Sequence, residues 1–260
     1  PWTGRWSHAA VILDDGAVLS LGGYDGDYKN DVFQIEPGGT TLTQVTAEAE
    51  WSGRFGLCVV QLPGTNETVL IGGGGQNDAW RSTDSGLTFT KISSNVFAAV
   101  GREYHGCVAV TATKLFALGG QSATNVYHND VRVSTDSGAT WNDVDHSSCG
   151  GNQQRWSKRY AFSFTFMPLL GRIVISGGKE SDTLWHNDVW YSNSDAKCWT
   201  LAKNDTNAAV DGYYGAVLLT VPFGGVEALL LLGGYRKVGG YSNNRIELSI
   251  DGGSIWSIVA

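Results

Sequence analysis

The sequence predicts an all-β protein in which a four-stranded unit is repeated five times. Two observations carry this prediction: the composition, and a set of short motifs that recur in a fixed order. The chain of 260 residues includes 35 glycines but only 5 prolines and one methionine, which is typical of many short strands joined by tight turns. No segment shows the periodicity of an amphipathic helix. A helical protein is therefore excluded.

Each unit opens with an arginine, an aromatic or polar residue, and then a strand-like run. The copies follow one another at intervals of about 50 residues. In the fifth copy Asp211 stands where the arginine is expected. The five copies are Arg5-Trp6-Ser7-His8-Ala9, Arg54-Phe55-Gly56-Leu57-Cys58, Arg102-Glu103-Tyr104-His105-Gly106, Arg159-Tyr160-Ala161-Phe162-Ser163 and Asp211-Gly212-Tyr213-Tyr214-Gly215.

Two further motifs follow in every unit. A short apolar run ends in a glycine pair, and pairs of this kind at strand ends allow positive φ and close backbone approach. The pairs are Gly22-Gly23, Gly72-Gly73, Gly119-Gly120, Gly177-Gly178 and Gly233-Gly234. An Asn-Asp pair then opens the next strand, at Asn30-Asp31, Asn77-Asp78, Asn129-Asp130 and Asn187-Asp188, and it decays to Asn244-Arg245.

Four-stranded units at this spacing predict the blades of a β-propeller, which pack face to face and protect their edges. We expect a single domain over residues 1–260, with blades at approximately 1–49, 50–97, 98–153, 154–207 and 208–260. A closed five-bladed ring is the simplest arrangement, and a fragment of a six- or seven-bladed ring is the alternative. Because the sequence starts inside a repeat unit, we expect a mature chain or an excised domain.

The order of arginine, glycine pair, Asn-Asp and tryptophan resembles the kelch repeat family over the whole chain. The end of each unit resembles an Asp-box, Ser-x-Asp-x-Gly-x-Thr-Trp, a motif known from sialidases and many other propellers. Copies begin at Ser82, Ser134 and Ser249, a worn copy begins at Ser192, and the first unit, around Gly38, has lost the motif. We expect the aspartate of each copy to stabilise a hairpin turn and the aromatic residue to pack between sheets.

Charge and hydropathy exclude two classes of partner. The net charge is −7 and the isoelectric point is near 5.1. A nucleic-acid partner is not predicted, because there is no basic stripe. The longest apolar runs, among them residues 228–232, are the size of a strand, so no membrane insertion is predicted either.

The four cysteines allow at most two disulfides. Cys58 and Cys107 lie one position out of register on the first strands of adjacent blades. Cys149 precedes the fourth blade, and Cys198 lies in its last strand. We expect these two neighbouring pairs to be bonded.

Two sequons, at Asn66 and Asn204, predict glycosylation in loops. Together with the even number of cysteines they favour an extracellular or cell-surface location. A cytosolic protein with buried free thiols is the alternative.

The kelch resemblance implies that two sets of loops share one face, where propellers usually bind ligands. These are the loops entering each first strand and the loops joining the second and third strands. Aromatic rings beside carboxylates and amides suit a sugar. The predicted ligand-binding residues of the second set are Tyr24, Tyr28, Trp80, Tyr127, His128, Trp185, His186 and Tyr235. The first set carries Trp2, Trp51 and Trp156, whose repetition favours packing between blades.

Four repeated arginines are further candidates: Arg5, Arg54, Arg102 and Arg159. Several guanidinium groups in one mouth could hold a ligand carboxylate, as in sialidases. The alternative is that they form hydrogen bonds within each blade, as the kelch resemblance implies.

Nothing in the sequence completes a catalytic or metal site. Glu103 and Tyr104 are candidates for a sialidase-type pair only through their proximity to Arg102, and no separate acid is identifiable. His128 and His186 are two of the three or four ligands that a metal site needs. No catalytic residue, metal or cofactor is therefore predicted.

These observations favour a non-catalytic extracellular recognition module that binds a glycan or a protein through its aromatic loop face. Because propeller folds host binders and enzymes alike, two alternatives stay open. One is a carbohydrate-active enzyme, such as a sialidase-like glycosidase or a lyase. The other is a structural repeat within a larger extracellular assembly.

Overall fold

The computed structural model describes residues 2–147, 149, 155–205, 212–237 and 245–259. Within these ranges the regular structure consists of β-strands, with no helix, as the composition predicts. The chain forms two compact units. Unit 1 comprises Pro1–Val126 and Arg132–Asp143, and unit 2 comprises Tyr127–Val131 and Val144–Ala260.

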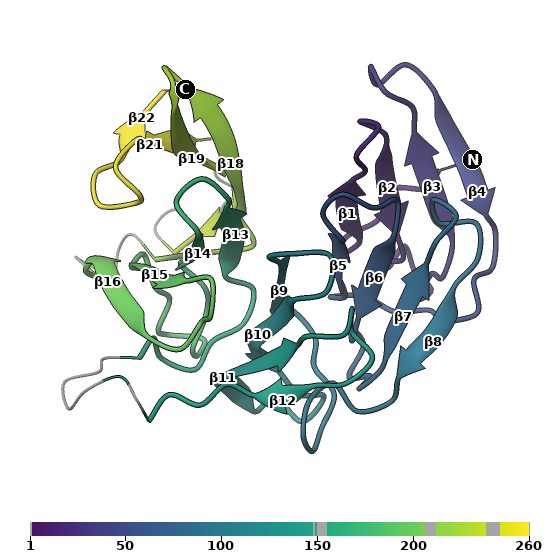
Figure 1. The fold of residues 1–260 in the computed structure, drawn as a ribbon, viewed down its shortest axis with the longest axis horizontal. Coiled ribbons are helices and arrows are strands. Elements are labelled where there is room, and N and C mark those ends of the chain that lie inside the picture. The colour runs from purple at the N-terminus through teal and green to yellow at the C-terminus, as the bar shows by residue number, and fades with distance from the viewer. Residues whose placement is uncertain (1, 148, 150–154, 206–211, 238–244, 260) are drawn as a thin grey trace. The chain divides into compact units, whose positions relative to one another are not determined.

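Unit 1 contains the first two blades and most of the third (Figure 1). In each blade the strands are antiparallel and follow one another in chain order. Strand β11 contributes residues to both units. The strands are β1 (Ala9–Ile12), β2 (Val18–Leu21), β3 (Val32–Ile35), β4 (Leu42–Thr46), β5 (Cys58–Gln61), β6 (Thr68–Ile71), β7 (Ala79–Ser82), β8 (Thr90–Ser93), β9 (Gly106–Ala109), β10 (Leu115–Gln121), β11 (Tyr127–Ser134) and β12 (Asn142–Asp143).

Unit 2 contains the fourth and fifth blades. A two-stranded ladder of β17 and β20 supplements the fifth. The strands are β13 (Ser163–Met167), β14 (Arg172–Ser176), β15 (Val189–Asn193), β16 (Trp199–Lys203), β17 (Tyr213–Tyr214), β18 (Val217–Phe223), β19 (Val226–Leu232), β20 (Tyr235–Arg236), β21 (Ile246–Ser249) and β22 (Ser257–Ile258). The five four-stranded antiparallel blades confirm the predicted propeller class.

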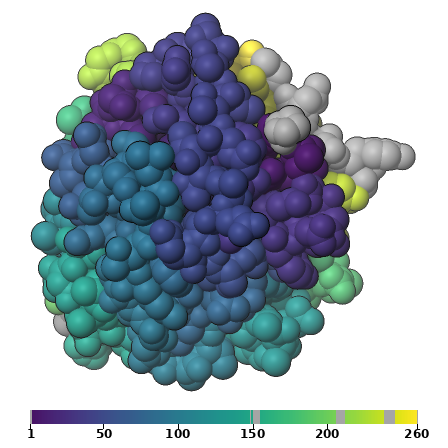
Figure 2. Space-filling model, turned by 90° about the vertical axis from the view of Figure 1, so that its right-hand side faces the viewer, coloured from purple at the N-terminus to yellow at the C-terminus, as the bar shows by residue number. Residues whose placement is uncertain are grey.

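Neighbouring blades pack through apolar side chains within each unit. In unit 1, Leu19 and Leu21 of the first blade pack with Leu70 of the second. The edges of these blades also meet, since the Thr46 hydroxyl donates to the carbonyl of Gly86 at 2.8 Å, and their surfaces lie next to each other in Figure 2. In unit 2 a second core is formed by residues of the fourth and fifth blades, including Met167, Val174, Val189, Leu218 and Leu229.

Two of the repeated tryptophans are buried core residues that pack against rings of their own blades. Trp51 is 1% exposed and Trp156 is fully buried. Trp51 contacts the ring of Phe89 edge-on, with 6.0 Å between the ring centroids. Trp156 contacts Trp199 in the same way at 5.9 Å. The interpretation of these two tryptophans as packing residues is confirmed.

The repeated arginine and the aspartate of Asn-Asp form one buried ion pair in each of three blades. Arg54 donates to both carboxylate oxygens of Asp78, at 2.6 and 3.2 Å, and to the carbonyl of Gly72 at 2.9 Å. The same bonds join Arg5 to Asp31 and Arg159 to Asp188. In each of these three blades, residues 24 to 29 positions apart thus form one network. This network uses the donors that a ligand carboxylate would need.

The fifth blade departs from the predicted alignment. Asp211 lies outside the described residues. Tyr213 occupies the arginine position, because its N–H donates to the carbonyl of His186 at 3.0 Å, just as the Arg159 N–H donates to His128 at 3.1 Å. Burial raises the pKa of the Tyr213 phenol, whose oxygen lies 2.5 Å from the Ser176 hydroxyl oxygen. The unit therefore opens two residues later than Asp211, with a phenol in place of the guanidinium.

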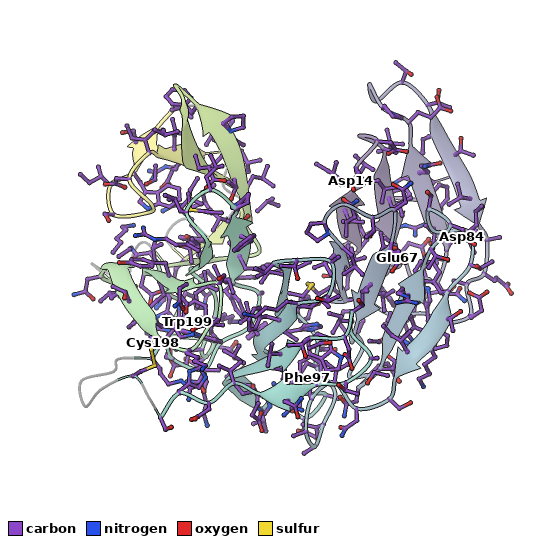
Figure 3. All side chains as sticks on the ribbon, viewed as in Figure 1. Asp14, Glu67, Asp84, Phe97, Cys198 and Trp199 are labelled. Atoms are coloured by element: carbon purple, nitrogen blue, oxygen red, sulfur yellow. A yellow bond between two sulfur atoms is a disulfide. The ribbon has the colours of Figure 1, made fainter. Side chains whose placement is uncertain are left out.

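Three hairpins share a hydrogen-bond pattern around an aspartate: Asp84, Asp136 and Asp251. Asp84, between β7 and β8 (Figure 3), accepts hydrogen bonds from the Ser82 hydroxyl at 2.8 Å and the Thr88 N–H at 2.9 Å. Burial alone would raise the pKa of Asp84, but these bonds and the one from the Thr88 hydroxyl outweigh it and lower the pKa. The Asp84 carboxylate therefore stabilises the turn in which it lies.

Both expected disulfides are present. Cys58 is bonded to Cys107, which joins β5 to β9. Cys149 is bonded to Cys198, just before β16 (Figure 3). Two disulfides fit an oxidising compartment.

Both sequon asparagines, Asn66 and Asn204, are exposed. Thr206, which completes the second sequon, lies outside the described residues. Across the described part of the chain, no helix has the length and hydropathy to cross a bilayer. Glycosylation of the two asparagines stays a prediction.

Candidate functional site

Aromatic rings meet where one blade joins the next. The ring just after a blade's opening residue contacts a ring from the preceding blade, from the loop before its third strand or the start of that strand. Tyr28 stacks on Phe55 in this way, with 5.4 Å between ring centroids and 16° between planes. Tyr127 stacks on Tyr160 at 5.1 Å and 19°. Trp185 meets Tyr214 edge-on at 5.0 Å. We call these contacts junction pairs.

Backbone contacts position these pairs. The N–H of Arg54 donates to the carbonyl of Lys29 at 3.0 Å, which brings the residues beside them, Phe55 and Tyr28, together. The chains approach so closely that a Cβ at Gly53 would lie 2.2 Å from the carbonyl oxygen of Tyr28. Only glycine fits at that position, so the sequence around the opening arginine determines where the rings lie.

In unit 1 the junction pair is part of a larger cluster, which we call the unit 1 aromatic site. It comprises Trp6, Tyr24, Tyr28, Phe55 and Tyr104. Centroid distances between neighbouring rings run from 5.2 Å for Tyr24–Tyr28 to 5.8 Å for Trp6–Phe55. Trp6 is 54% exposed and Tyr28 is 58% exposed. The site is therefore a connected group of rings, two of which are largely open to solvent.

Polar groups border this site. Lys29 and Asp25 form an ion pair at 3.0 Å. The hydroxyl of Thr3 donates to Asp25. The hydrogen bonds from Thr3 and Lys29 lower the pKa of Asp25 to about 2, so it is a carboxylate at neutral pH. Ser7 donates to the Tyr104 hydroxyl at 3.3 Å. Hydrogen-bonding groups thus lie at the edge of the aromatic cluster.

Unit 2 carries a second cluster, the unit 2 aromatic site, formed by Tyr127, Tyr160, Trp185, Tyr214 and Tyr235. Tyr235 lies 5.7 Å from Trp185 and 5.5 Å from Tyr214 between centroids. The ammonium group of Lys179 lies 5.6 to 5.9 Å from the rings of Tyr160, Trp185 and Tyr214. Trp185 is only 9% exposed. Lys179 also forms an ion pair with Asp182 at 2.8 Å. This cluster is therefore more closed than its counterpart and, like it, is bordered by an ion pair.

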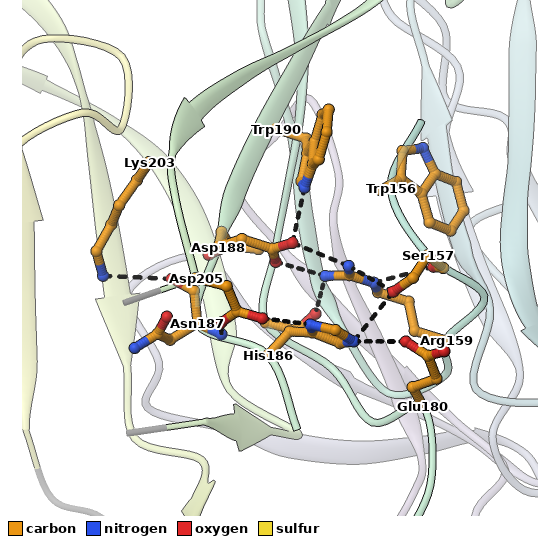
Figure 4. Close-up of polar contacts among 12 residues, drawn as sticks. Trp156, Ser157, Arg159, Glu180, His186, Asn187, Asp188, Trp190, Lys203 and Asp205 are labelled. Carbon is orange, nitrogen blue, oxygen red and sulfur yellow. Dashed lines mark hydrogen bonds and ion pairs between the residues drawn. The ribbon is translucent and has the colours of Figure 1, made fainter. Parts of the chain in front are cut away.

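A polar cluster around His186 lies in unit 2 (Figure 4). Its Nδ1 lies 2.6 Å from Asp205, and its Nε2 lies 2.9 Å from Glu180 and 3.0 Å from the hydroxyl oxygen of Ser157. Burial alone would raise the pKa of Asp205, but hydrogen bonds from His186 and the Asn187 N–H outweigh it and lower the pKa. The imidazole is therefore held between two carboxyl groups.

This cluster resembles a catalytic triad only in part. Ser157, His186 and Asp205 have the required order and distances. A triad, however, needs a neutral Nε2 that accepts the serine proton, and here Glu180 faces the same nitrogen. Asp205 faces Nδ1, and Glu180 competes with Ser157 for Nε2. The arrangement therefore supports a structural clamp between chain segments better than nucleophilic catalysis.

The same region contains a group of possible metal ligands, in which atoms of His186, Asp188 and Asp205 lie within 4.8 Å of one another. Asp188 is already engaged by Arg159, at 2.5 and 2.9 Å, and by the indole of Trp190 at 2.7 Å. The buried guanidinium beside this group opposes a cation. We assign no metal to it.

The residues predicted to bind a ligand lie in several different parts of the structure. Tyr24 and Tyr28 belong to the unit 1 aromatic site, and Tyr127, Trp185 and Tyr235 to the unit 2 aromatic site. His186 is the centre of the polar cluster. His128 lies at the start of β11, where its carbonyl accepts the Arg159 N–H. Ligand binding by any of them stays a prediction.

The remaining candidates are used inside blades. Trp80 lies within β7 rather than in a loop, and its indole donates to Asp78 at 2.8 Å. Arg54 and Arg159 are 1% exposed, and Arg102, 4% exposed, donates to the carbonyl of Gly119 at 3.3 Å. Arg5 also pairs within its own blade, with Asp31. Their role as ligand contacts is not part of the function proposed below.

Sequence reasoning did not single out four ring residues of the two aromatic sites, namely Trp6, Phe55, Tyr160 and Tyr214. It considered a fifth, Tyr104, only for a sialidase-type pair. A signal for three of the four was present, because an aromatic residue follows the repeated arginine directly at Trp6, Phe55 and Tyr160. The fourth follows Tyr213, which the alignment had not placed at the arginine position.

Blades of this kind, with aromatic clusters at their junctions, define a β-propeller protein with candidate binding surfaces. No family model matches the chain. A xyloglucanase from a Paenibacillus species is 24% identical over 226 residues, which cover 77% of this chain and 21% of that protein. The chain thus spans about a fifth of the length of this curated relative.

The solved structure of YjhT is similar over 100% of this chain and 85% of its own, with a TM-score of 0.74 and 12% sequence identity. At that identity the likeness concerns the fold alone. It supports the β-propeller architecture of the five blades.

Proposed function

We propose that this chain is an extracellular carbohydrate-recognition domain that binds a neutral polysaccharide at the unit 1 aromatic site. The observation that carries the proposal is the group of five connected rings, in which Trp6 and Tyr28 are more than half exposed. Large exposed apolar patches usually mark binding surfaces. Flat rings suit the C–H faces of pyranoses, and the bordering hydroxyl and charged groups suit their hydroxyls.

The charges at the site favour a neutral sugar. Lys29 is paired with Asp25, so this border offers no unpaired cation for an acidic sugar. The similarity to a protein named xyloglucanase supports a carbohydrate ligand and makes xyloglucan the first polysaccharide to test.

The repeat family and the secreted, glycosylated state of the chain are part of the same proposal. We propose that the blades are kelch repeats with Asp-box hairpins, which the Arg–Asp networks and the aspartate-centred turns support. We also propose a secreted glycoprotein modified at Asn66 and Asn204, which the two disulfides support.

Catalysis by a carbohydrate-active enzyme is the competing function. It would need two carboxyl groups roughly 5–10 Å apart on either side of a glycosidic bond. At the unit 1 aromatic site, Asp25 is tied to Thr3 and Lys29, which leaves it poorly placed as an acid. The similarity to the xyloglucanase is the finding that favours this second candidate.

Binding of the purified chain to a panel of polysaccharides tests the proposal. The panel includes xyloglucan, other neutral β-glucans and a polyuronate, with affinity gel electrophoresis and calorimetry as readouts. We expect binding to at least one neutral polymer and none to the polyuronate. Release of reducing ends from the bound polymer would favour the enzyme. A chain that binds none of the neutral polymers would contradict the proposal.

A further inference from the structure

The junction between the second and third blades lacks the aromatic pair found at the other three. The same backbone contacts are present there. The Arg102 N–H donates to the carbonyl of Gln76 at 3.2 Å, and a Cβ at Gly101 would lie 2.1 Å from the carbonyl oxygen of Gly75. By this register Gly75 stands where Tyr28 stands in the first blade, and Glu103 stands where Phe55 stands in the second. At this junction a glycine and a carboxyl side chain therefore take the places of the two aromatic rings.

The position of Gly75 keeps this junction open. Its φ is +73°, and a Cβ there would lie 2.9 Å from the Cβ of Ala123. A side chain is therefore disfavoured by conformation and by space. Gly74 beside it also has a positive φ, +57°. A ligand can approach the backbone and the Glu103 carboxyl here more closely than it could at a ring-filled junction.

Glu103 is held in a fixed place. Its backbone pairs with Gln121 in both directions, at 2.9 and 3.0 Å. Its Oε1 accepts a hydrogen bond from the side-chain amide of Gln121 at 2.8 Å. Among the described residues, no hydrogen bond reaches its Oε2. The residue is 8% exposed, and this burial raises the pKa of the carboxyl. One oxygen of a nearly buried acid is thus left for another donor.

The carboxyl borders the unit 1 aromatic site. Tyr104, the next residue, is a member of that site and lies 5.6 Å from Phe55 between ring centroids. A Cβ on Gly56, which follows Phe55, would lie 3.3 Å from the Cβ of Glu103. The acid and the rings are therefore parts of one surface within unit 1.

We propose that Glu103 determines the specificity of the unit 1 aromatic site by accepting a hydrogen bond, through Oε2, from a pyranose hydroxyl. This inference rests on the proposed function, because the neighbouring sugar stacks on the exposed ring of Tyr28. The ligand class that fits is a neutral, hydroxyl-bearing glycan. An acidic sugar would set a second carboxylate against Glu103, and a sugar methylated at that hydroxyl would have no proton to donate.

The near-burial of Glu103 makes the contact selective for ligands that carry a hydroxyl donor. Glu103 is 8% exposed, and its Oε2 is not among the fully buried atoms. A ligand that supplies a donor to Oε2 is therefore preferred over one that displaces water there without replacing its hydrogen bond. The same burial disfavours ionised Glu103 in the empty protein, which is the kind of stability cost expected of a functional group.

The test compares binding of a xyloglucan oligosaccharide to wild type, Glu103→Gln and Glu67→Gln by calorimetry. Glu67 lies between β5 and β6 of the same unit (Figure 3) and provides an equal change of charge away from the site. Loss of a charge-assisted hydrogen bond weakens binding roughly 10- to 100-fold. We expect that loss for Glu103→Gln and an unchanged affinity for Glu67→Gln.

The pH dependence separates this role from a structural one. Since the pKa of Glu103 is raised, wild-type affinity should fall on acidification at a higher pH than an ordinary glutamate would produce. Glu103→Gln should lack that step. Its free energy of unfolding at pH 7 should equal or exceed that of wild type, because raised-pKa acids destabilise the folded state once ionised.

Three results would overturn the inference. The first is Glu103→Gln binding within twofold of wild type with the same pH profile. The second is lost binding accompanied by lower stability, which would make Glu103 structural. The third is a wild-type chain that binds no neutral glycan, which would overturn the proposed function as well, whereas the first two leave that function standing.

Discussion

Replacing Arg54 with methionine should lower the free energy of unfolding by about 3–5 kcal/mol, the usual cost of breaking a buried ion pair from one side. The guanidinium is 1% exposed and bonds both oxygens of Asp78 and the carbonyl of Gly72. Methionine fills much of the space but leaves the Asp78 carboxylate buried with the Trp80 indole as its closest remaining donor. Urea unfolding at pH 7 measures the loss.

Acidification should reduce this loss. Burial alone would raise the pKa of Asp78, but the bonds from Arg54 outweigh it and lower the pKa. The pair therefore stabilises wild type above the ordinary aspartate pKa, and this stabilisation is lost as pH falls. In Arg54→Met the acid protonates more readily, so the difference from wild type should shrink towards acidic pH. Adding Asp78→Leu should recover part of the stability.

A loss below about 1 kcal/mol for Arg54→Met at pH 7 would contradict the buried-pair account. Arg81→Met is a suitable control in the same unit, because its pair with Glu67 is long, at 3.6 Å, and 37% of the Arg81 side chain is exposed. Exposed pairs of this kind contribute about 0–1 kcal/mol.

Replacing Trp6 or Tyr28 with alanine should weaken polysaccharide binding by about tenfold or more each, since central aromatic contacts at binding surfaces commonly exceed 1 kcal/mol. The double variant should show no detectable binding in affinity electrophoresis. Both side chains are more than half exposed, so the free energy of unfolding should change by less than about 1 kcal/mol. Measurements of binding and of unfolding therefore distinguish a lost sugar contact from a destabilised fold.

Leu169→Ala provides the matched control. Leu169 is 80% exposed and lies in unit 2, between β13 and β14, so its removal deletes exposed apolar surface that is not part of the unit 1 aromatic site. Unchanged binding by Trp6→Ala, together with weakened binding by Trp185→Ala, would show that the sugar binds at the unit 2 aromatic site instead.

The repeat made most of the fold predictable. The arginine and the aspartate of the repeated motifs pair with each other in three of the blades, and the spacing of the motifs predicted the blades before any contact was known. The fifth blade was misaligned because Tyr213 replaces the guanidinium with a phenol. An alignment by residue type could not detect that change, since the backbone bond to His186 is what marks the position.

The candidate site was predictable only in part. Tyr24 and Tyr28 were recognised as loop aromatics, but Trp6 and Phe55 were not, because ring packing within a blade and ring exposure at a junction use the same residue types. Exposure depends on how adjacent blades approach at Gly53. Glu103 was singled out only through its proximity to Arg102, and its burial and its bond to Gln121 required coordinates.

The central claim is that a neutral glycan binds at the unit 1 aromatic site. Nuclear magnetic resonance of the ten tryptophan indole groups, assigned by single substitutions, tests it during titration with a xyloglucan oligosaccharide. The account predicts a saturable shift of the Trp6 resonance, while the buried Trp51 and Trp156 stay unperturbed. A titration that leaves Trp6 unshifted at saturating sugar, or that shifts only Trp185, would contradict it.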